Sequence, residues 1–439
     1  MSAAVQNCDV LIIGGGPAGS TAAILLAEQG YRVVLVEKAR HPRFHIGESL
    51  LPANLPLFER LGVAEAVRNI GMEKWGAEFI SPWDGRRQEF EFAGAWDKRL
   101  PLAYQVRRSE FDEILIRRAA ACGTQVIEGC RAREIEFLDD GRRARVQVLH
   151  DDGRPGVWEA AHLIDASGRE TFLGNRLGAK RRNPRHNSAA LYAHFTGALR
   201  DCGKREGNIA IYWFDHGWFW FIPLADGTTS VGAVVWPRYL RTRSVDLRSF
   251  FLATIAQCPP LAERLSGATL VSEVEATGNY SYACDRSHGA NYLLVGDAYA
   301  FVDPVFSSGV LLAMTSGAAA AETIDLRVKD PARAASALRR FDRLMRHGPK
   351  QFCWFIYRVT NPTMRELFLN PRNPLRMQEA LLSLLAGDIF GRTPIWASLR
   401  AFKGVYYALC AAHPGRSIRA ARARALNVSA TESEPVPSG

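Results

Sequence analysis

The N-terminal part of the chain alternates between short apolar runs and a segment with helical composition. Residues 10–13 and 31–36 are rich in Val, Ile and Leu, which is typical of strands buried on both faces of a parallel sheet. The Ala-rich residues 21–29 lie between them and predict a helix. This strand–helix–strand order predicts an α/β fold built on a Rossmann-like unit.

Farther along the chain, a two-residue alternation predicts a second sheet. Residues 71–92 suggest a strand pair, and residues 189–195, 209–214, 218–222 and 230–235 suggest four more strands. In residues 217–223, the two-residue period puts Trp218 and Trp220 on one face and Phe219 and Phe221 on the other. Such a strand is either enclosed in a core or lines a pocket for a flat ring, and periodicity leaves both possibilities open.

From Pro331 onward the pattern is mostly helical. We therefore predict a discontinuous nucleotide-binding domain over 1–72, 104–185 and 285–330, and a β-sheet substrate domain over 73–103 and 186–284. A helical C-terminal lobe over 331–428 and a polar, disordered tail over 429–439 complete the expected organisation.

The glycines after the first strand supply the first candidate chemistry. Gly14, Gly16 and Gly19 form Gly-x-Gly-x-x-Gly between a strand and a helix, where they allow a tight turn and close approach to a pyrophosphate. The helix N-terminus favours phosphate. Glu37 ends the second strand, where a carboxylate can bind a ribose hydroxyl. Ala18, inside the same motif, is a further candidate contact.

Other candidate cofactor contacts follow predicted strands or open predicted helices. One of these predicted helices ends near Ala121, and Ser109 is expected to be its N-cap rather than a cofactor contact. The free N–H groups expected near Ser308 and Gly309 form a candidate anion site. The remaining candidates are Arg43, Ser49, Gln105, Arg107, Asp165, Gly168, Asp297 and Pro304.

Composition narrows the function classes. The 439 residues carry a net charge of +10, and the eight cysteines form no metal-binding pattern. No nucleic-acid motif accompanies the charge, so we expect no nucleic-acid partner and no metal. An early first strand and the lack of a long apolar run predict a cytoplasmic protein.

The C-terminal region is the most basic part of the chain. Residues 371–428 hold nine Arg or Lys against two acids. This pattern fits a peripheral membrane contact, a docking surface for an acidic partner, or an ordinary packed helical cap.

Three segments give the chain a resemblance to a known family. Residues 47–52 (GESLLP), 218–223 (WFWFIP) and 303–310 (DPVFSSGV) are similar to segments of the flavin-dependent halogenases, especially those acting on phenols or pyrroles. These enzymes belong to the p-hydroxybenzoate hydroxylase-like FAD superfamily, whose fold resembles glutathione reductase. The resemblance covers residues 5 to about 330.

The resemblance implies a cofactor and a reaction. Reduced FAD from a separate flavin reductase, O2, and chloride or bromide held at Ser308 and Gly309 would give hypohalous acid. Lys74 matches the family's catalytic lysine, which hydrogen-bonds this oxidant or becomes a haloamine. Trp218 and Trp220 would keep the organic substrate away from the flavin and so prevent direct monooxygenation.

The expected substrate is an electron-rich aromatic compound such as a phenol, either free or on an acyl carrier protein, and not free tryptophan. Three alternatives stay open. They are an FAD-dependent aromatic monooxygenase, a geranylgeranyl reductase-type oxidoreductase, and a non-enzymatic flavin-bound docking protein.

Overall fold

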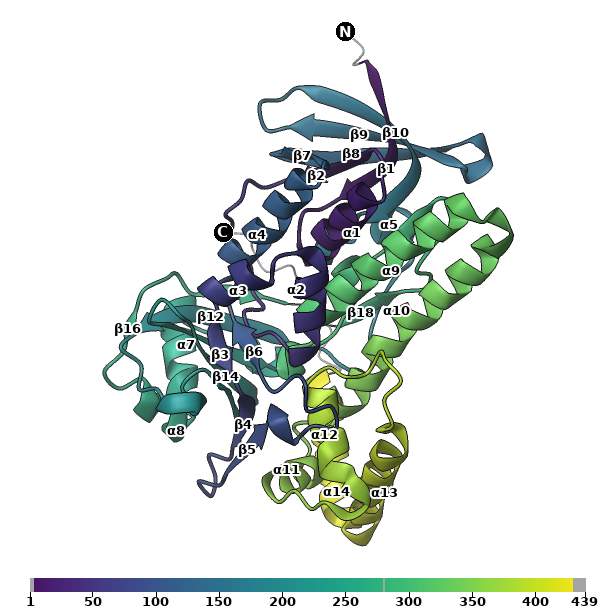
Figure 1. Cartoon of the computed structure of the whole chain (residues 1–439). Coiled ribbons are helices and arrows are strands. Elements are labelled where there is room, and N and C mark those ends of the chain that lie inside the picture. Colours follow the sequence, from purple (N-terminus) through teal and green to yellow (C-terminus); the bar gives the residue numbers. More distant parts are fainter. Residues whose placement is uncertain (1–3, 279–280, 429–439) are drawn as a thin grey trace. The chain divides into compact units, whose positions relative to one another are not determined.

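The computed structural model of the chain (Figure 1) describes residues 4–278 and 281–428, which divide into two units. The first unit comprises the described residues of Met1–Gly71, Val106–Arg181 and Tyr282–Phe352. The second comprises those of Met72–Gln105, Arg182–Ser281 and Cys353–Gly439. The tail predicted over 429–439 lies outside the described residues.

The first unit contains a seven-stranded sheet in the order β7-β2-β1-β10-β9-β8, with β19 also paired to β10. β1 pairs in parallel with β2 and β10, whereas β9 runs antiparallel to both β10 and β8. Residues 10–13 and 33–37 are buried along their whole length, which explains their uninterrupted apolar pattern. The strands are β1 (Val5–Ile13), β2 (Val33–Glu37), β7 (Gln125–Glu128), β8 (Cys130–Leu138), β9 (Arg143–His150), β10 (Pro155–Asp165) and β19 (Tyr292–Leu294).

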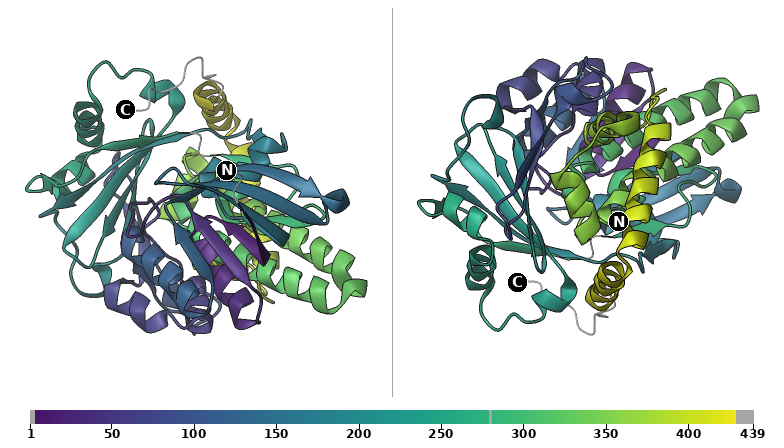
Figure 2. Two further views of the ribbon diagram at one scale, coloured as in Figure 1. Left: turned by 90° about the horizontal axis from the view of Figure 1, so that it is seen from above. Right: turned by 90° about the horizontal axis from the view of Figure 1, so that it is seen from below.

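Helix α1 (Pro17–Glu28) begins at Pro17, earlier than predicted, because the fixed φ of proline suits the first turn of a helix. α9 (Gly309–Lys329) approaches it closely, since a Cβ at Gly317 would lie 2.3 Å from the Ala18 carbonyl oxygen. α9 and the first part of α10 (Ala334–Ile356) run side by side (Figures 1 and 2). The other helices of this unit are α2 (Leu55–Leu61), α3 (Ala64–Ile70), α4 (Arg108–Ala121) and α5 (Phe172–Arg176), and a small sheet joins β11 (Lys180–Arg182), β18 (Tyr282–Cys284) and β20 (Ala300–Phe301).

The second unit is built on an eight-stranded sheet in the order β16-β12-β15-β14-β13-β4-β5, with β17 also paired to β12. The predicted strand pair within 71–92 is present as β4 and β5, and β4 runs parallel to β13. The strands are β4 (Gly76–Ile80), β5 (Arg87–Glu91), β12 (Ala189–Thr196), β13 (Ile209–Phe214), β14 (Gly217–Pro223), β15 (Thr228–Val235), β16 (Thr269–Leu270) and β17 (Glu275–Thr277), and a separate two-stranded ribbon joins β3 (Met72–Lys74) to β6 (Ala103–Gln105).

One face of this sheet forms a hydrophobic core with two helices. Phe219 and Phe221 of β14 pack in a buried cluster that includes Phe251 and Leu261. These two partners come from α7 (Leu247–Ala256) and α8 (Pro259–Arg264). The face of β14 that carries Phe219 and Phe221 is therefore enclosed in a core. The sequence pattern had left open whether this strand is enclosed in a core or lines a pocket.

The C-terminal helices α11 (Pro362–Leu369), α12 (Met377–Leu385), α13 (Trp396–Ala412) and α14 (Pro414–Val428) belong to the second unit. The Trp96 backbone N–H donates to the Ser383 hydroxyl at 2.8 Å, which ties α12 to the segment after β5. None of the described helices is both long and apolar enough to cross a bilayer.

Two predictions about helices were wrong. The helical lobe predicted over 331–428 is divided near Phe352, because the first part of α10 is tied to the first unit, where the Ser287 hydroxyl donates to the Asp342 carboxylate at 2.8 Å. α4 has Arg107, not Ser109, as its N-cap, and no side chain caps it.

Candidate functional site

The glycine turn between β1 and α1 has no room for side chains. Gly14 has a φ of +107°, and a Cβ there would lie 2.3 Å from the Ala166 carbonyl oxygen. A Cβ at Gly19 would lie 1.9 Å from the Gly14 carbonyl oxygen. No side chain caps α1 at Gly16, so its first N–H groups are left for an anionic ligand.

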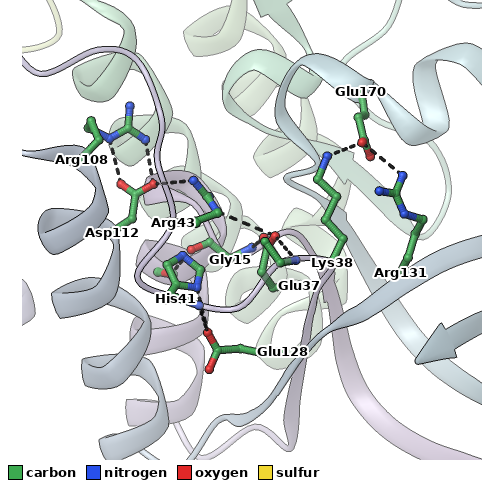
Figure 3. A network of polar contacts seen from close by, with 12 residues as sticks. Gly15, Glu37, Lys38, His41, Arg43, Arg108, Asp112, Glu128, Arg131 and Glu170 are labelled. Carbon is green, nitrogen blue, oxygen red and sulfur yellow. Dashed lines mark hydrogen bonds and ion pairs between the residues drawn. The ribbon is translucent and has the colours of Figure 1, made fainter. Parts of the chain in front are cut away.

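Glu37 braces this turn from the end of β2 (Figure 3). Its carboxylate accepts hydrogen bonds from the backbone N–H of Gly15 at 2.7 Å and of Ala39 at 2.9 Å. A carboxylate has about four acceptor positions. Glu37 therefore fixes the glycine turn while it retains acceptor positions for the predicted ribose contact.

Arg43 is held above the turn by a buried carboxylate (Figure 3). Its Nη1 lies 3.2 Å from Asp112 Oδ2, and its Nη2 would be 3.7 Å from a Cβ at Gly16. Arg108 donates to both Asp112 oxygens at 2.9 Å. Although burial opposes ionisation, the guanidinium groups of Arg108 and Arg43 hold the pKa of the Asp112 carboxyl below its usual value. Asp112 thus orients a cation beside the glycine turn.

Three other predicted cofactor contacts are Ser49, Gln105 and Arg107. The structure places Ser49 and Arg107 in the first unit and Gln105 in the second. Ser49 is buried in the first unit, where the Val106 N–H donates to the Glu48 carbonyl at 2.8 Å. Arg107 is the N-cap of α4. Gln105 instead belongs to the second unit, and its side-chain amide donates to the Gly207 carbonyl at 2.9 Å.

Asp165 holds the turn at the end of β10. Its buried carboxylate accepts hydrogen bonds from Ser167 N at 2.9 Å and Leu173 N at 2.7 Å. Burial raises the pKa of this carboxyl. Gly168 has a φ of +62° and open space around its Cβ position. Asp165 is therefore a residue that shapes the turn, and Gly168 provides half-buried backbone with open space beside it.

The start of α9 combines a buried hydroxyl with open space. Ser308 is 1% exposed, and its Oγ has no hydrogen-bond partner among the described residues. A Cβ at Gly309 would have nothing within 4 Å, and Pro304 opens the preceding 3-10 turn, Pro304–Phe306. A buried hydroxyl without a partner favours a ligand here, because buried polar groups in native proteins are nearly always paired.

Asp297 follows β19 in a 3-10 turn, Gly296–Ala298, of the same unit. Burial raises the pKa of its carboxyl to about 6, and the Arg169 and Arg108 guanidinium groups oppose this effect. At neutral pH this carboxylate is therefore mostly ionised and can accept a hydrogen bond from a ligand hydroxyl.

Lys74 is a buried amine at the end of β3, in the second unit. It is 1% exposed, and its Nζ lies 5.3 Å from the centroid of the Phe92 ring. Burial lowers the pKa of Lys74 to about 7. A large fraction of the amine is therefore uncharged at neutral pH, and an uncharged amine is a nucleophile.

Trp218 and Trp220 lie on the face of β14 opposite the phenylalanine core. Their ring centroids are 6.0 Å apart, and both indoles are buried. Trp220 Nε1 donates to the Ser230 hydroxyl at 3.1 Å. A Cβ at Gly232 would lie only 2.2 Å from the Trp220 ring. The indole of Trp220 is thus held at its Nε1 edge by the Ser230 hydroxyl, and its ring packs directly against the backbone of Gly232.

Comparisons with known proteins identify the family. A family model described as "FAD binding domain" matches residues 7–336. The tryptophan 2-halogenase of Chondromyces crocatus is 37% identical over 347 residues, which cover 77% of this chain and 65% of the relative. The 1H-pyrrole-2-carbonyl-[peptidyl-carrier protein] chlorinase of Pseudomonas fluorescens is 31% identical over 411 residues, which cover 88% of this chain and 90% of the relative. The chain belongs to the flavin-dependent halogenases.

A solved structure agrees with this assignment. The halogenase superposes on the myxobacterial chondrochloren halogenase CndH with a TM-score of 0.77 and 33% identity, over 90% of this chain and 93% of that one. The predicted α/β fold and the FAD cofactor are thereby confirmed. The residues present fit FAD, since the glycine turn is free of side chains, Arg43 lies beside it, and the Ser308 hydroxyl is unpaired among the described residues.

Four residues that shape these sites were not among the sequence predictions. Asp112 and Arg108 were detectable, because their (i, i+4) spacing on a helix brings the side chains together. Gly232 was detectable as a glycine within a predicted strand, which often marks a close approach. Ser230 carried no signal, because its partnership with Trp220 depends on the register of β14 against β15.

Proposed function

We propose that this enzyme halogenates an electron-rich aromatic ring by way of hypohalous acid, with Lys74 as the group that passes the halogen to the substrate. Lys74 carries the proposal, because a lysine buried to 1% exposure with a pKa near 7 is poised for such chemistry. Ordinary surface lysines titrate more than three pH units higher.

The residues of the first unit would hold the cofactor and the halide. Gly14, Gly16 and the start of α1 would bind the pyrophosphate, with Arg43 as its counter-charge. Reduced FAD and O2 supply the oxidising power that converts halide to hypohalous acid. The backbone N–H groups at Ser308 and Gly309 would hold the halide, because free N–H groups at a helix start favour an anion.

Lys74 can act in two ways on hypohalous acid. As the ammonium form it donates a hydrogen bond and so directs the electrophile. As the free amine, its nitrogen bonds to the halogen and loses a proton while water leaves. The haloamine then gives the halogen to a ring carbon, and the proton released from that carbon restores the amine. The lowered pKa makes both forms available near neutral pH.

The tryptophan pair has a proposed role in selectivity. Trp218 and Trp220 are both buried, and Ser230 holds the indole of Trp220, so the pair can block a passage. We assign them the exclusion of organic substrate from the flavin. This exclusion would suppress direct monooxygenation and leave halide as the acceptor of the oxidising equivalent.

The proposed substrate is a phenol or a similar electron-rich ring, either free or thioester-linked to a carrier protein. The Pseudomonas relative named as acting on a carrier-bound pyrrole aligns along 90% of its length, which supports the carrier-linked form. A separate flavin reductase would supply reduced FAD.

The test is halide-dependent product formation. The purified protein would be given FAD, a flavin reductase, O2, bromide or chloride, and either monochlorodimedone or a simple phenol. We expect a halogenated product only when halide is present, and loss of the halogenated phenol in Lys74→Ala with FAD binding retained. Oxygen insertion with direct NADPH consumption would instead assign a monooxygenase, and unchanged turnover in Lys74→Ala would remove the lysine from the mechanism.

A further inference from the structure

Helix α14 presents an unusual outer face. Arg416, Arg419 and Arg422 are all exposed, and their spacing of three residues places them along one side of the helix. Leu426 and Ile418, which are 58% and 52% exposed, lie on the same side by the helical period. We call these five residues the arginine face.

The opposite side of α14 is packed against the rest of the second unit. Arg424 lies there, and its Nη2 donates to the Arg185 carbonyl at 3.1 Å and lies 3.0 Å from His186 Nδ1. Its guanidinium carbon is 5.7 Å from the ring centroids of Trp236 and Tyr357. These contacts fix the helix, so the arginine face is turned outward by the fold.

The charge of the arginine face is only partly balanced by its own chain, since among the described residues Arg416 alone of the three has a carboxylate near enough to be affected, that of Glu366, whose pKa is lowered by Arg86 and also by Arg416. Many other surface arginines pair with carboxylates, such as Arg32 with Asp9 at 2.9 Å and Arg40 with Asp151 at 2.6 Å. Arg416, Arg419 and Arg422 form no ion pair with any described residue. α13 and α14 together contain six Arg or Lys and no Asp or Glu. The face therefore complements an acidic surface.

We propose that the arginine face docks an acidic carrier protein that brings the aromatic substrate as a thioester. This inference rests on the proposed function, in its carrier-linked form. A protein partner fits better than a lipid surface, because interfacial helices separate an inserted apolar face from a basic face. In α14 the apolar and basic side chains share one face, as in protein interfaces, where a few apolar contacts lie among polar ones.

The test compares charge variants of the FAD-loaded, full-length protein. The binding probe is an acidic peptidyl carrier protein loaded with a pyrrole-2-carbonyl or 4-hydroxybenzoyl group. The variants are R416E/R419E/R422E and the milder R416Q/R419Q/R422Q. The matched control, R133E/R142E/R339E, makes the same charge change at three exposed arginines of the first unit that form no ion pair with a described residue.

We expect the Kd for the loaded carrier to rise roughly tenfold or more in the charge-reversed variant and less in the glutamine variant, because exposed charge pairs each contribute modestly. The control should stay within about twofold of the wild type, since long-range steering alone is screened by salt. Halogenation of a free phenol should be unchanged in all variants. Circular dichroism would verify that the total helix content is retained.

The other outcomes separate this inference from the proposed function. Unchanged carrier affinity in both arginine-face variants, or an equal loss in the control, would overturn the docking site while free-phenol halogenation still supported the function. Binding to phosphatidylserine-containing vesicles that the charge reversal abolishes, with carrier affinity unaffected, would assign the face to lipid instead. Carrier binding that requires the three arginines, without any halogenated product, would support the docking site and reject the function.

Discussion

The candidate sites in the two units of this halogenase are built by different means. In the first unit the glycine turn works through its backbone, and side chains such as Glu37 and Asp112 serve to hold that backbone and Arg43 in place. In the second unit the proposed chemistry depends on side chains, namely the amine of Lys74 and the indole of Trp220. A site made of closely packed backbone has no room for an added side-chain atom. A site made of side chains instead has its reactivity and orientation set by burial and by neighbouring residues.

The largest effect is expected where an added atom meets backbone. In Gly19→Ala the new Cβ would start 1.9 Å from the Gly14 carbonyl oxygen, so α1 must shift away from the turn. We expect loss of bound FAD, measured as the ratio of flavin to protein absorbance after gel filtration. The control is Gly404→Ala, where a Cβ meets nothing within 4 Å. Retention of full flavin occupancy in Gly19→Ala would refute the close approach.

Asp112→Asn should give the next largest effect. The substitution removes a buried carboxylate between two guanidinium groups, and breaking a buried ion pair typically costs about 3–5 kcal/mol. The pKa of Asp112 is lowered in the folded state, so its contribution is present above the usual carboxyl pKa and is lost as pH falls through the lowered value. Urea unfolding at pH 7 measures the loss.

Asp9→Asn provides the matched control for Asp112→Asn. Asp9 pairs with Arg32 at an exposed site, and such pairs contribute about 1 kcal/mol or less. Equal losses of unfolding free energy in the two variants would show that the Asp112 network has no special role in stability.

Lys74→Met should stabilise the protein while it abolishes halogen transfer. Because burial lowers the pKa of Lys74 from 10.5 to about 7, the folded state resists protonation. The destabilisation is complete below pH 7 and disappears as pH rises toward the unfolded pKa. The variant should therefore gain on the order of a few kcal/mol below pH 7 and progressively less above it.

Guanidinium unfolding of wild type and Lys74→Met at pH 6 and pH 9 measures how the gain in unfolding free energy depends on pH. Lys204→Met is the control, because Lys204 is exposed and lies over the Trp75 ring at 4.5 Å. A gain for Lys74→Met that is the same at both pH values would mean that the amine is not destabilised by burial.

The smallest effect is expected for Ser230→Ala. The variant removes the hydrogen bond from Trp220 Nε1 and leaves a buried donor unpaired, which costs about 1–3 kcal/mol. Gly232→Ala, in which the new methyl meets the indole ring, should cost at least as much. Thermal unfolding measures stability, and the halogenated product formed per flavin oxidised reports the position of Trp220. Wild-type values of both quantities in Gly232→Ala would show that the indole is not held in place.

Much of the first unit could be predicted from the sequence. Local patterns sufficed for β1, α1, β2 and the glycine turn, because buried parallel strands leave continuous apolar runs and tight turns require glycine. The strands of the second sheet also agreed closely with prediction, as in β13 over Ile209–Phe214. The lobe at 331–428 and the Ser109 cap were wrong because both depend on how segments pack.

The sequence by itself determined the fold class, the family and the location of the glycine turn. These properties are local, since each rests on residues close together in the chain. Only the tertiary structure decided that Lys74 is buried, that Ser230 and Gly232 fix Trp220, and that α14 turns three arginines outward. The burial of a side chain and the register of paired strands depend on residues far apart in the sequence, so a local sequence pattern does not predict them.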